Sequence, residues 1–163
     1  MKNKRYLPDH RFMKEAIALA KEAEKTGDIP VGAVVVRDGV IIGRGYNRRE
    51  RDQSATAHAE ICAIEDACRT LGSWHLDSCE LYVTLEPCPM CAGAIINSRI
   101  GRVIFGAYDP KAGSLRSVTD LFFLPYNHRP EIWAGVMEEE TRALLEDFFR
   151  KLRKNETALR AEE

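Results

Sequence analysis

The sequence predicts a single α/β domain in which helices cover a mixed sheet. Three observations predict it: a β-hairpin pattern near the N-terminus, an alternation of helix and strand patterns after it, and a length of 163 residues. A domain of this length buries about two thirds of its surface, so it needs no disulfide to hold a core. We therefore expect residues 1–163 to form one domain.

The first part of the chain contains a helix pattern followed by the hairpin. Apolar residues at helical spacing over 9–25 predict an amphipathic helix, and Thr26–Pro30 breaks it. The apolar segments 32–37 and 40–46 predict two strands. Asp38-Gly39 between them suits a two-residue primed turn, so the two strands are expected to form a β-hairpin.

Helix and strand patterns then alternate. Their order is helix, strand, helix, strand and a final helix, which predicts crossover units with helices packed on the sheet. The corresponding segments are 56–71, 80–85, 87–98, 102–107 and about 138–155, and the region 109–130 is expected to be mainly loop.

Composition and charge exclude several classes of protein. The chain has 24 Lys and Arg against 25 Asp and Glu, and this net charge of -1 argues against a protein that coats nucleic acid indiscriminately. Basic residues do cluster locally, because Phe148–Lys154 holds four of them and no acidic residue. The odd count of 5 Cys argues against a fully paired disulfide framework.

No segment predicts export or membrane insertion. The N-terminal residues are basic, but no apolar run of signal-peptide length follows them. The most apolar stretch, Val31–Val36, is far too short to span a bilayer. We therefore expect a cytoplasmic protein with no membrane partner.

Two short motifs carry the chemistry. His58-Ala59-Glu60 lies at the predicted start of one helix, and Pro87–Cys91 lies at the start of the next. The thirty positions from His58 to Cys88 allow a helix to cross the sheet and a strand to return. Both helix starts are then expected at the same end of the sheet, facing each other.

The residue types at these positions suit zinc. Cys88 and Cys91 are three apart, so both sulfurs project from one helix face, at an end whose partial positive charge favours thiolates. With His58 they make three ligands, and three ligands with one open position is the pattern of catalytic zinc. The open position would hold a water whose pKa the metal lowers. Regular helical geometry would turn Glu60 away from the metal, but the looser geometry of a helix start allows it to act as a proton shuttle.

Other interpretations of the motifs remain open. The thiols can be a buried pair without a metal, or part of a closed structural zinc site with Cys62 or Cys79 as fourth ligand. A closed site would leave Glu60 without a role. A structural zinc would also suit a catalytically silent RNA-binding or scaffold protein.

The two motifs together match the known H-x-E and P-C-x-x-C signature of the zinc-dependent base deaminases, a match that is recognised rather than derived from spacing. From about Phe12 to Lys154 the chain resembles the bacterial tRNA-specific adenosine deaminases of the cytidine-deaminase-like superfamily. One departure is Ser114-Leu115-Arg116, where many relatives carry a small Gly-containing stretch. Cytosine, guanine and nucleotide deaminases share Thr56–Ile61 and Glu86–Ala92. The more discriminating segments are Ile29–Ala33, Leu81–Glu86, Ser98–Gly106, Asp109–Gly113, Asn127–Arg129 and Phe148–Arg153.

The resemblance implies a fold and a reaction. The fold is a three-layer α/β/α domain with a central five-stranded mixed sheet. The reaction is zinc-dependent hydrolytic deamination of adenosine to inosine at the wobble position of a tRNA anticodon. His58, Cys88 and Cys91 would hold one Zn²⁺ per subunit, and Glu60 would be the catalytic proton carrier. The resemblance also implies a homodimer that binds the anticodon stem-loop. The alternative within the superfamily is a deaminase of a free base, guanine or cytosine.

The resemblance further implies which residues bind the substrate. Their positions match a nucleoside-contacting asparagine, a nucleotide-contacting loop, a pocket wall and a terminal helix that faces the anticodon loop. Each position also has a simpler interpretation. Asn47 can merely end a strand, Asp109 can form a turn, Phe149 can pack against the core, and Arg153 can belong to a solvated basic face. The expected substrate-binding residues are Asn47, Asp109, Lys111, Asn127, Phe149 and Arg153.

Overall fold

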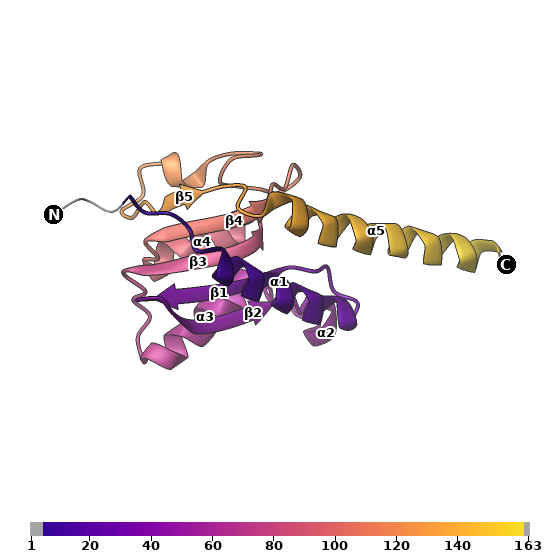
Figure 1. Cartoon of the computed structure of the whole chain (residues 1–163), viewed down its shortest axis with the longest axis horizontal. Coiled ribbons are helices and arrows are strands. Elements are labelled where there is room, and N and C mark those ends of the chain that lie inside the picture. Colours follow the sequence, from indigo (N-terminus) through magenta and orange to yellow (C-terminus); the bar gives the residue numbers. More distant parts are fainter. Residues whose placement is uncertain (1–4, 162–163) are drawn as a thin grey trace.

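A mixed sheet of five strands runs through the protein in the order β2-β1-β3-β4-β5 (Figure 1). The computed structural model describes residues 5–161. Strand β1 is antiparallel to β2 and β3, whereas β3, β4 and β5 are parallel. The strands are β1 (Gly32–Arg37), β2 (Val40–Tyr46), β3 (Cys79–Leu85), β4 (Arg102–Ala107) and β5 (Glu131–Trp133).

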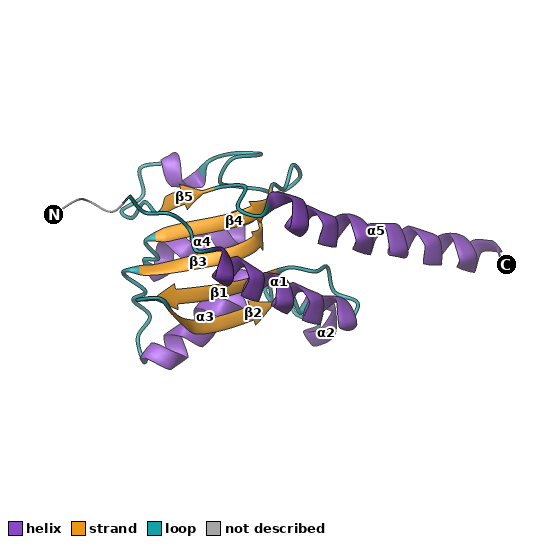
Figure 2. Cartoon of the chain, in the orientation of Figure 1, coloured by secondary structure: helices purple, strands orange, loops and turns teal. Residues whose placement is uncertain are grey.

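Helices cover both faces of this sheet (Figure 2). One face carries α1 (His10–Lys25) and the start of α5 (Glu138–Ala161), and the other carries α3 (Ala59–Leu71) and α4 (Pro89–Ser98). A single turn, α2 (Arg49–Asp52), follows β2. The expected three-layer α/β/α fold is thereby confirmed.

The alternation of side chains along β1 explains the two cores. Ala33 and Val35 belong to the larger core, under α3 and α4, while Val34 and Val36 belong to the smaller core, under α1. Successive residues of a strand point to opposite faces, so a strand buried on both sides reads as an unbroken apolar run. The hairpin turn also has the expected primed form, because both Asp38 and Gly39 have positive φ.

Glycines on β2 bring α3 unusually close to the sheet. A Cβ at Gly43 would lie 2.7 Å from the backbone nitrogen of Ala67, and one at Gly45 would lie 2.5 Å from that of Ala63. Side chains at these two positions would push the helix away. The glycines therefore set the distance between β2 and α3, the helix whose first residues enter the cleft described below.

Three short elements differ from the sequence-based expectation. The sequence pattern predicts four strands but not β5, which has 3 residues and pairs with β4 at the edge of the sheet. It also missed α2 and a 3-10 turn at Leu121–Phe123. Elements of three or four residues are too short to show a periodic pattern. Pairing with distant segments and capping of their ends determine whether they form. Helix α5 begins at the expected residue and continues to Ala161.

Among the residues described, none of the helices has the length and apolar character needed to cross a membrane.

Candidate active site

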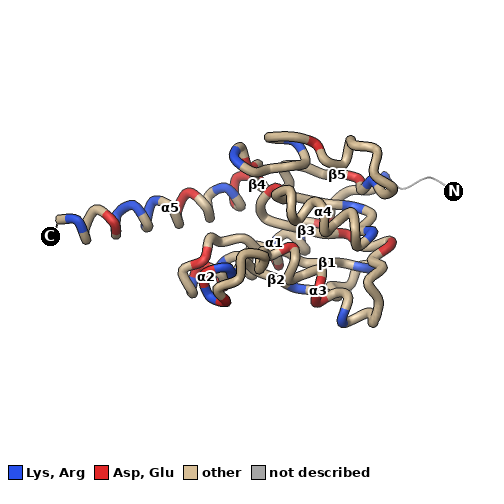
Figure 3. The backbone as a smooth tube through the Cα atoms, turned by 180° about the vertical axis from the view of Figure 1, so that it is seen from behind, with Lys and Arg blue, Asp and Glu red and all other residues tan. Residues whose placement is uncertain are grey.

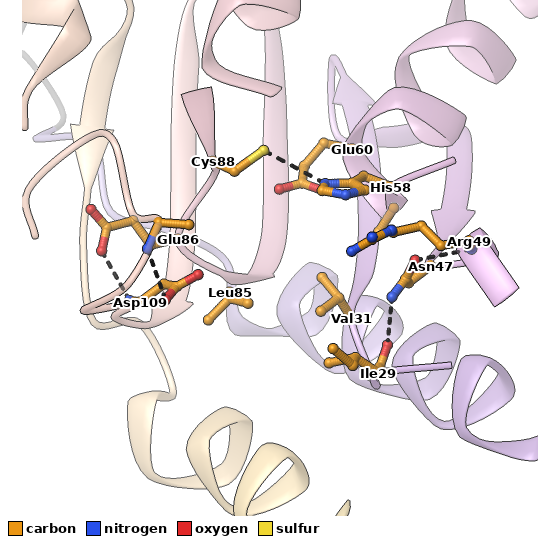
Figure 4. Close-up of a pocket in the computed structure, with 12 residues that line it drawn as sticks. Ile29, Val31, Asn47, Arg49, His58, Glu60, Leu85, Glu86, Cys88 and Asp109 are labelled. Carbon is orange, nitrogen blue, oxygen red and sulfur yellow. Dashed lines mark hydrogen bonds between the residues drawn. The ribbon is translucent and has the colours of Figure 1, made fainter. Parts of the chain in front are cut away.

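The candidate active site is a small cleft where β3 and β4 end and where α3 and α4 begin. Its volume is about 190 Å³. Figure 4 shows His58 and Asn47 on one wall and Glu86 and Asp109 on the other. Ligands of α/β sheets bind beyond the carboxyl ends of parallel strands, and this cleft has that position. Its apolar lining consists of Ile29, Val31, Ala59, Leu85 and Ala112.

Three potential metal ligands meet beside this cleft. His58 and Cys88 are the N-cap residues of α3 and α4, and Cys91 lies in the first turn of α4. Both Sγ atoms lie 3.6 Å from Nδ1 of His58. All three donor atoms lie within 4.8 Å of one another, so this group can hold a metal ion. The two helix starts therefore face each other as the spacing predicts.

The measured distances fit a tetrahedral ion. Bonds of about 2.3 Å to sulfur and about 2.0–2.1 Å to nitrogen, at a tetrahedral angle, separate the two ligand atoms by about 3.6 Å. The two N–S distances in the structure are 3.6 Å. One imidazole and two thiolates are also donors that zinc accepts, so both the donor set and its spacing fit zinc.

The two thiols differ in how readily they ionise. The hydrogen bond with Cys91, and after it the one with His58, lowers the pKa of Cys88 to about 4, although burial opposes this shift. Contact with Cys88 and burial raise the pKa of Cys91. Cys88 is therefore the readily formed thiolate, at a helix end whose partial charge favours an anion.

Glu60 lies in the same cleft although it is close to His58 in sequence. It is the second residue of α3 and is 4% exposed, and its carboxyl group lines the cleft with His58 and Cys88 (Figure 4). Because His58 is an N-cap with extended backbone, the two side chains can reach the same space. Burial raises the pKa of Glu60 to about 7, which suits a group that both accepts and donates protons near neutral pH.

A fourth protein ligand does not join the three within residues 5–161. The sulfur of Cys62 accepts a hydrogen bond from Arg48 at 3.4 Å instead. Cys79 begins β3, at the far end of that strand from Cys88. The geometry therefore favours a site with an open position over the closed structural site that uses either cysteine.

Glu86 organises the opposite wall of the cleft. It follows β3, is 1% exposed, and accepts a hydrogen bond from the hydroxyl of Ser117. Burial raises the pKa of Glu86, but its hydrogen bonds outweigh this effect and leave the pKa below its ordinary value. The loop 109–117 thus wraps around one buried carboxylate. Four backbone N–H groups also donate to it, those of Asp109 at 3.1 Å, Leu115 at 3.2 Å, Arg116 at 2.7 Å and Ser117 at 2.9 Å.

The segment that departs from the family pattern, Ser114–Arg116, lies inside this loop. The N–H groups of Leu115 and Arg116 are two of the donors to Glu86, and the N–H of Ser114 donates to the carbonyl of Pro87 at 2.9 Å. The departure from the pattern therefore keeps the loop tied to the end of β3.

Two of the expected substrate-binding residues line the cleft. Asn47 is buried, and its amide donates to the carbonyl of Ile29 at 3.2 Å. Asp109 lies on the opposite wall, where its Oδ1 accepts hydrogen bonds from the N–H groups of Lys111 and Ala112. Both side chains are thus fixed by local bonds before any substrate enters.

The other expected residues lie outside the cleft lining. Lys111 is exposed next to Asp109, and Asn127 is exposed with its Oδ1 accepting from Arg99 at 3.0 Å. Phe149, on α5, borders a groove that adjoins the cleft, whereas Arg153 lies further along the exposed part of the same helix.

Two residues that line the cleft were missed by sequence reasoning. Glu86 was identified only as part of a motif, although a carboxylate between an apolar strand and a Pro-Cys pair is a usable signal. Arg49 lies in the charged run Arg48–Asp52, where nothing in the sequence separates it from its neighbours.

Comparison with known proteins agrees with this geometry. The chain matches the MafB19-like deaminase family over residues 8–153. It is 50% identical over 153 residues to the tRNA-specific adenosine deaminase of Bacillus subtilis (strain 168), an alignment that covers 93% of this chain and 95% of the relative. It is 48% identical over 145 residues to the tRNA-specific adenosine deaminase of Aquifex aeolicus (strain VF5), which covers 88% of this chain and 95% of that one.

Solved structures lead to the same group. A structure from a study of A-to-I editing by tRNA:A34 deaminases at the wobble position of transfer RNA has a TM-score of 0.82 and 43% identity, and the match covers 84% of this chain and 100% of that chain. Guanine deaminase from Bacillus subtilis has a TM-score of 0.61 and 40% identity, covering 76% of this chain and 82% of its own. The chain therefore belongs to the deaminase family and, within it, to the tRNA-specific adenosine deaminases.

Proposed function

We propose that this protein hydrolyses adenosine to inosine at the wobble position of a tRNA anticodon loop. The observation that carries the proposal is the cleft in which the buried carboxyl group of Glu60 lies beside His58, Cys88 and Cys91. The close similarity to enzymes named tRNA-specific adenosine deaminases supports RNA, rather than a free base, as the substrate.

His58, Cys88 and Cys91 would hold one zinc ion. When bound, zinc lowers the pKa of a water molecule toward neutrality. The donor set and the N–S distances of 3.6 Å support this metal.

Glu60 would move the protons of the reaction. Its carboxylate accepts a proton from the attacking water as the oxygen bonds to C6 of the purine, and passes that proton to N1. It then transfers a second proton from the same oxygen to the departing amine, and ammonia leaves. Adenosine and water thus give inosine and ammonia. The buried carboxyl group, with its pKa raised to about 7, is suited to both directions of transfer.

The size of the cleft favours entry of the base alone. Its volume of about 190 Å³ is below the roughly 300–1,000 Å³ of pockets for drug-sized ligands. The adenine would be splayed out of its stack, which costs little in a single-stranded anticodon loop. Asn47 and Asp109 would contact the nucleoside inside the cleft. Lys111, Asn127, Phe149 and Arg153 would contact the RNA outside it.

Inosine mapping in an anticodon stem-loop RNA tests the proposal. The unaltered protein should form inosine at the wobble position, and Glu60→Gln should lower the rate by about 10²–10⁴-fold or more, because Gln cannot exchange protons. Zinc content and RNA binding should persist in this variant. Glu15→Gln, at an exposed position of α1, is the matched control and should keep full activity.

Two results would contradict the proposal. Conversion of free guanine or cytosine with no change in the RNA would identify a free-base deaminase. The absence of chemical activity from the unaltered protein, with zinc bound, would favour a silent RNA-binding protein.

We further propose a homodimer in the cytoplasm, where tRNA is modified. The resemblance to the family supports the dimer, as do the exposed apolar side chains of Phe123 and Leu124, which are 75% and 42% exposed. By contrast Ala92, Ile95 and Ile96 of α4 are buried in the subunit's own core. Sedimentation analysis of the purified chain checks the oligomeric state.

A further inference from the structure

A second hollow adjoins the catalytic cleft. It is a groove of about 480 Å³ between helix α5, at Phe148, Phe149 and Leu152, and the segments around residues 27–29 and 47–50. Ile29, Asn47 and Arg49 line both the cleft and the groove. The two hollows are therefore adjacent, and a ligand that enters the cleft has a neighbouring space for its next unit.

Arg49 is the one Lys or Arg among the described residues that line the cleft or the groove. Figure 4 shows its guanidinium extending from α2 into the cleft beside His58. Its neighbours Arg48 and Arg51 pair with Asp52, at 3.3 Å and 3.6 Å. Within residues 5–161, no carboxylate lies within 4.0 Å of the Arg49 guanidinium, so its charge is available to a ligand.

The backbone of Arg49 is fixed in advance. Its N–H donates to Oδ1 of Asn47 at 3.3 Å. Asp28, which is 1% exposed, accepts from the next two N–H groups, those of Glu50 at 2.7 Å and Arg51 at 3.1 Å. The carboxylate of Asp28 is thus used in holding α2, while Glu50 is the other acidic residue on the rim of the groove. These bonds fix the backbone from which the exposed Arg49 side chain extends.

We propose that Arg49 binds the phosphate that joins the target nucleotide to its neighbour, where the cleft adjoins the groove. This inference rests on the proposed RNA substrate. The cleft has room for a base, and the phosphate then lies at its mouth, where the guanidinium fork can donate two hydrogen bonds to phosphate oxygens. Because a free base has no phosphate, this contact favours a nucleotide chain over guanine or cytosine.

The test combines a protein variant with a chemically altered RNA. Inosine formation is measured for the unaltered protein and for Arg49→Gln, on the anticodon stem-loop and on versions in which one phosphate flanking the target adenosine is a neutral methylphosphonate. Arg49→Gln should raise KM by about tenfold with little change in kcat, and should reduce the slope of log affinity against log salt by about one. Neutralising the contacted phosphate should have the same effect, and the two changes together should cost no more than one alone.

Two variants serve as controls. Arg44→Gln removes the same charge from β2, at an exposed position outside both hollows, and should leave KM unchanged. Glu50→Gln removes the opposing charge and should lower KM. The inference is overturned if the effect of Arg49→Gln on KM adds to the effect of every methylphosphonate. It is also overturned if Arg44→Gln raises KM as much as Arg49→Gln does. Failure of the proposed function would be distinct, because the unaltered protein would then form no inosine from any of these RNAs.

Discussion

The cleft and helix α5 are held in place to very different degrees. In the cleft, Glu60 and Glu86 are 4% and 1% exposed, and Glu86 alone accepts hydrogen bonds from four backbone N–H groups and a hydroxyl. In α5, Thr141 is the buried residue, and the helix projects beyond the sheet from there (Figures 1 and 3).

We expect this difference to separate the chemistry from the recognition of the RNA. Proton transfer requires groups placed within hydrogen-bond reach, which only a packed and fully bonded region provides. The outer part of α5 is supported by exposed pairs such as Lys151 with Glu24, at 2.9 Å, and pairs of this kind contribute only about 0–1 kcal/mol. Acidic and basic residues both lie along this exposed helix (Figure 3), but its segment 150–154 carries basic residues and no acidic one, which suits contact with RNA. Three variants test this contrast.

The largest effect on activity is expected for the candidate metal ligands His58, Cys88 and Cys91. Cys91→Ser removes one of three ligands, and loss of even an indirect partner of a metal ligand lowers metal affinity by about 10–100-fold. We expect zinc affinity to fall by more than about 100-fold and inosine formation to be lost, as measured by elemental analysis and by RNA mapping. Cys68→Ser is the control. Cys68 is not one of the three candidate ligands, so this variant should keep both its zinc affinity and its inosine formation. A Cys91→Ser protein that retained zinc and activity would contradict the assigned ligand set.

An intermediate effect is expected at Glu86. Glu86→Gln places an amide N–H against several N–H donors, so the free energy of unfolding should fall by about 2–4 kcal/mol. The loop 109–117 should loosen, and kcat/KM should fall with it. Denaturant unfolding and stem-loop kinetics measure the two effects.

Glu131→Gln provides the comparison for Glu86. Glu131 is a carboxylate on the edge strand β5, and its side chain is 63% exposed and pairs with Arg102, so its loss should cost less than about 1 kcal/mol. Equal losses of stability in the two variants would show that the hydrogen bonds to Glu86 do not stabilise the cleft wall formed by the loop 109–117.

The smallest effect on stability is expected on α5. Phe149→Ala removes a side chain that is 38% exposed and packs edge-on against Phe148, so stability should change by less than about 1 kcal/mol. KM for the stem-loop should rise severalfold, because stacking of a base on an aromatic ring contributes about 1–3 kcal/mol. Leu159→Ala, at a more exposed position of the same helix, should leave KM unchanged. A loss of stability with no change in KM would assign Phe149 to packing alone.

Local patterns account for what was predictable in the fold. The hairpin followed from Asp38-Gly39 between two apolar runs, and α3 and α4 followed from their apolar spacing and their end residues. Strand β5 and helix α2 could not be predicted, since three or four residues show no period. Strand β5 exists because it pairs with β4, and α2 because Asp28, more than twenty residues earlier, accepts its N–H groups.

The candidate site divides in the same way. The ligand types and Glu60 were visible because metal chemistry restricts the residue types and because both motifs lie at helix starts. Glu86 carried a weak local signal that does not show which groups it contacts, and Arg49 carried none. Glu86 meets donors 23 to 31 residues away, and Arg49 differs from Arg48 and Arg51 only in the direction its side chain takes and in lacking an acidic partner within the described chain.

The sequence by itself therefore predicted four of the five strands with the helices that cover them, the three candidate metal ligands and the proposed proton carrier, because periodicity, turn chemistry and ligand chemistry each act over a few neighbouring residues. Only the tertiary structure decided the shape of the cleft, the buried carboxylate that holds its far wall, and the arginine at its junction with the groove. Packing between segments far apart in the chain sets those features. A local sequence pattern does not show which distant groups a buried or charged side chain will contact.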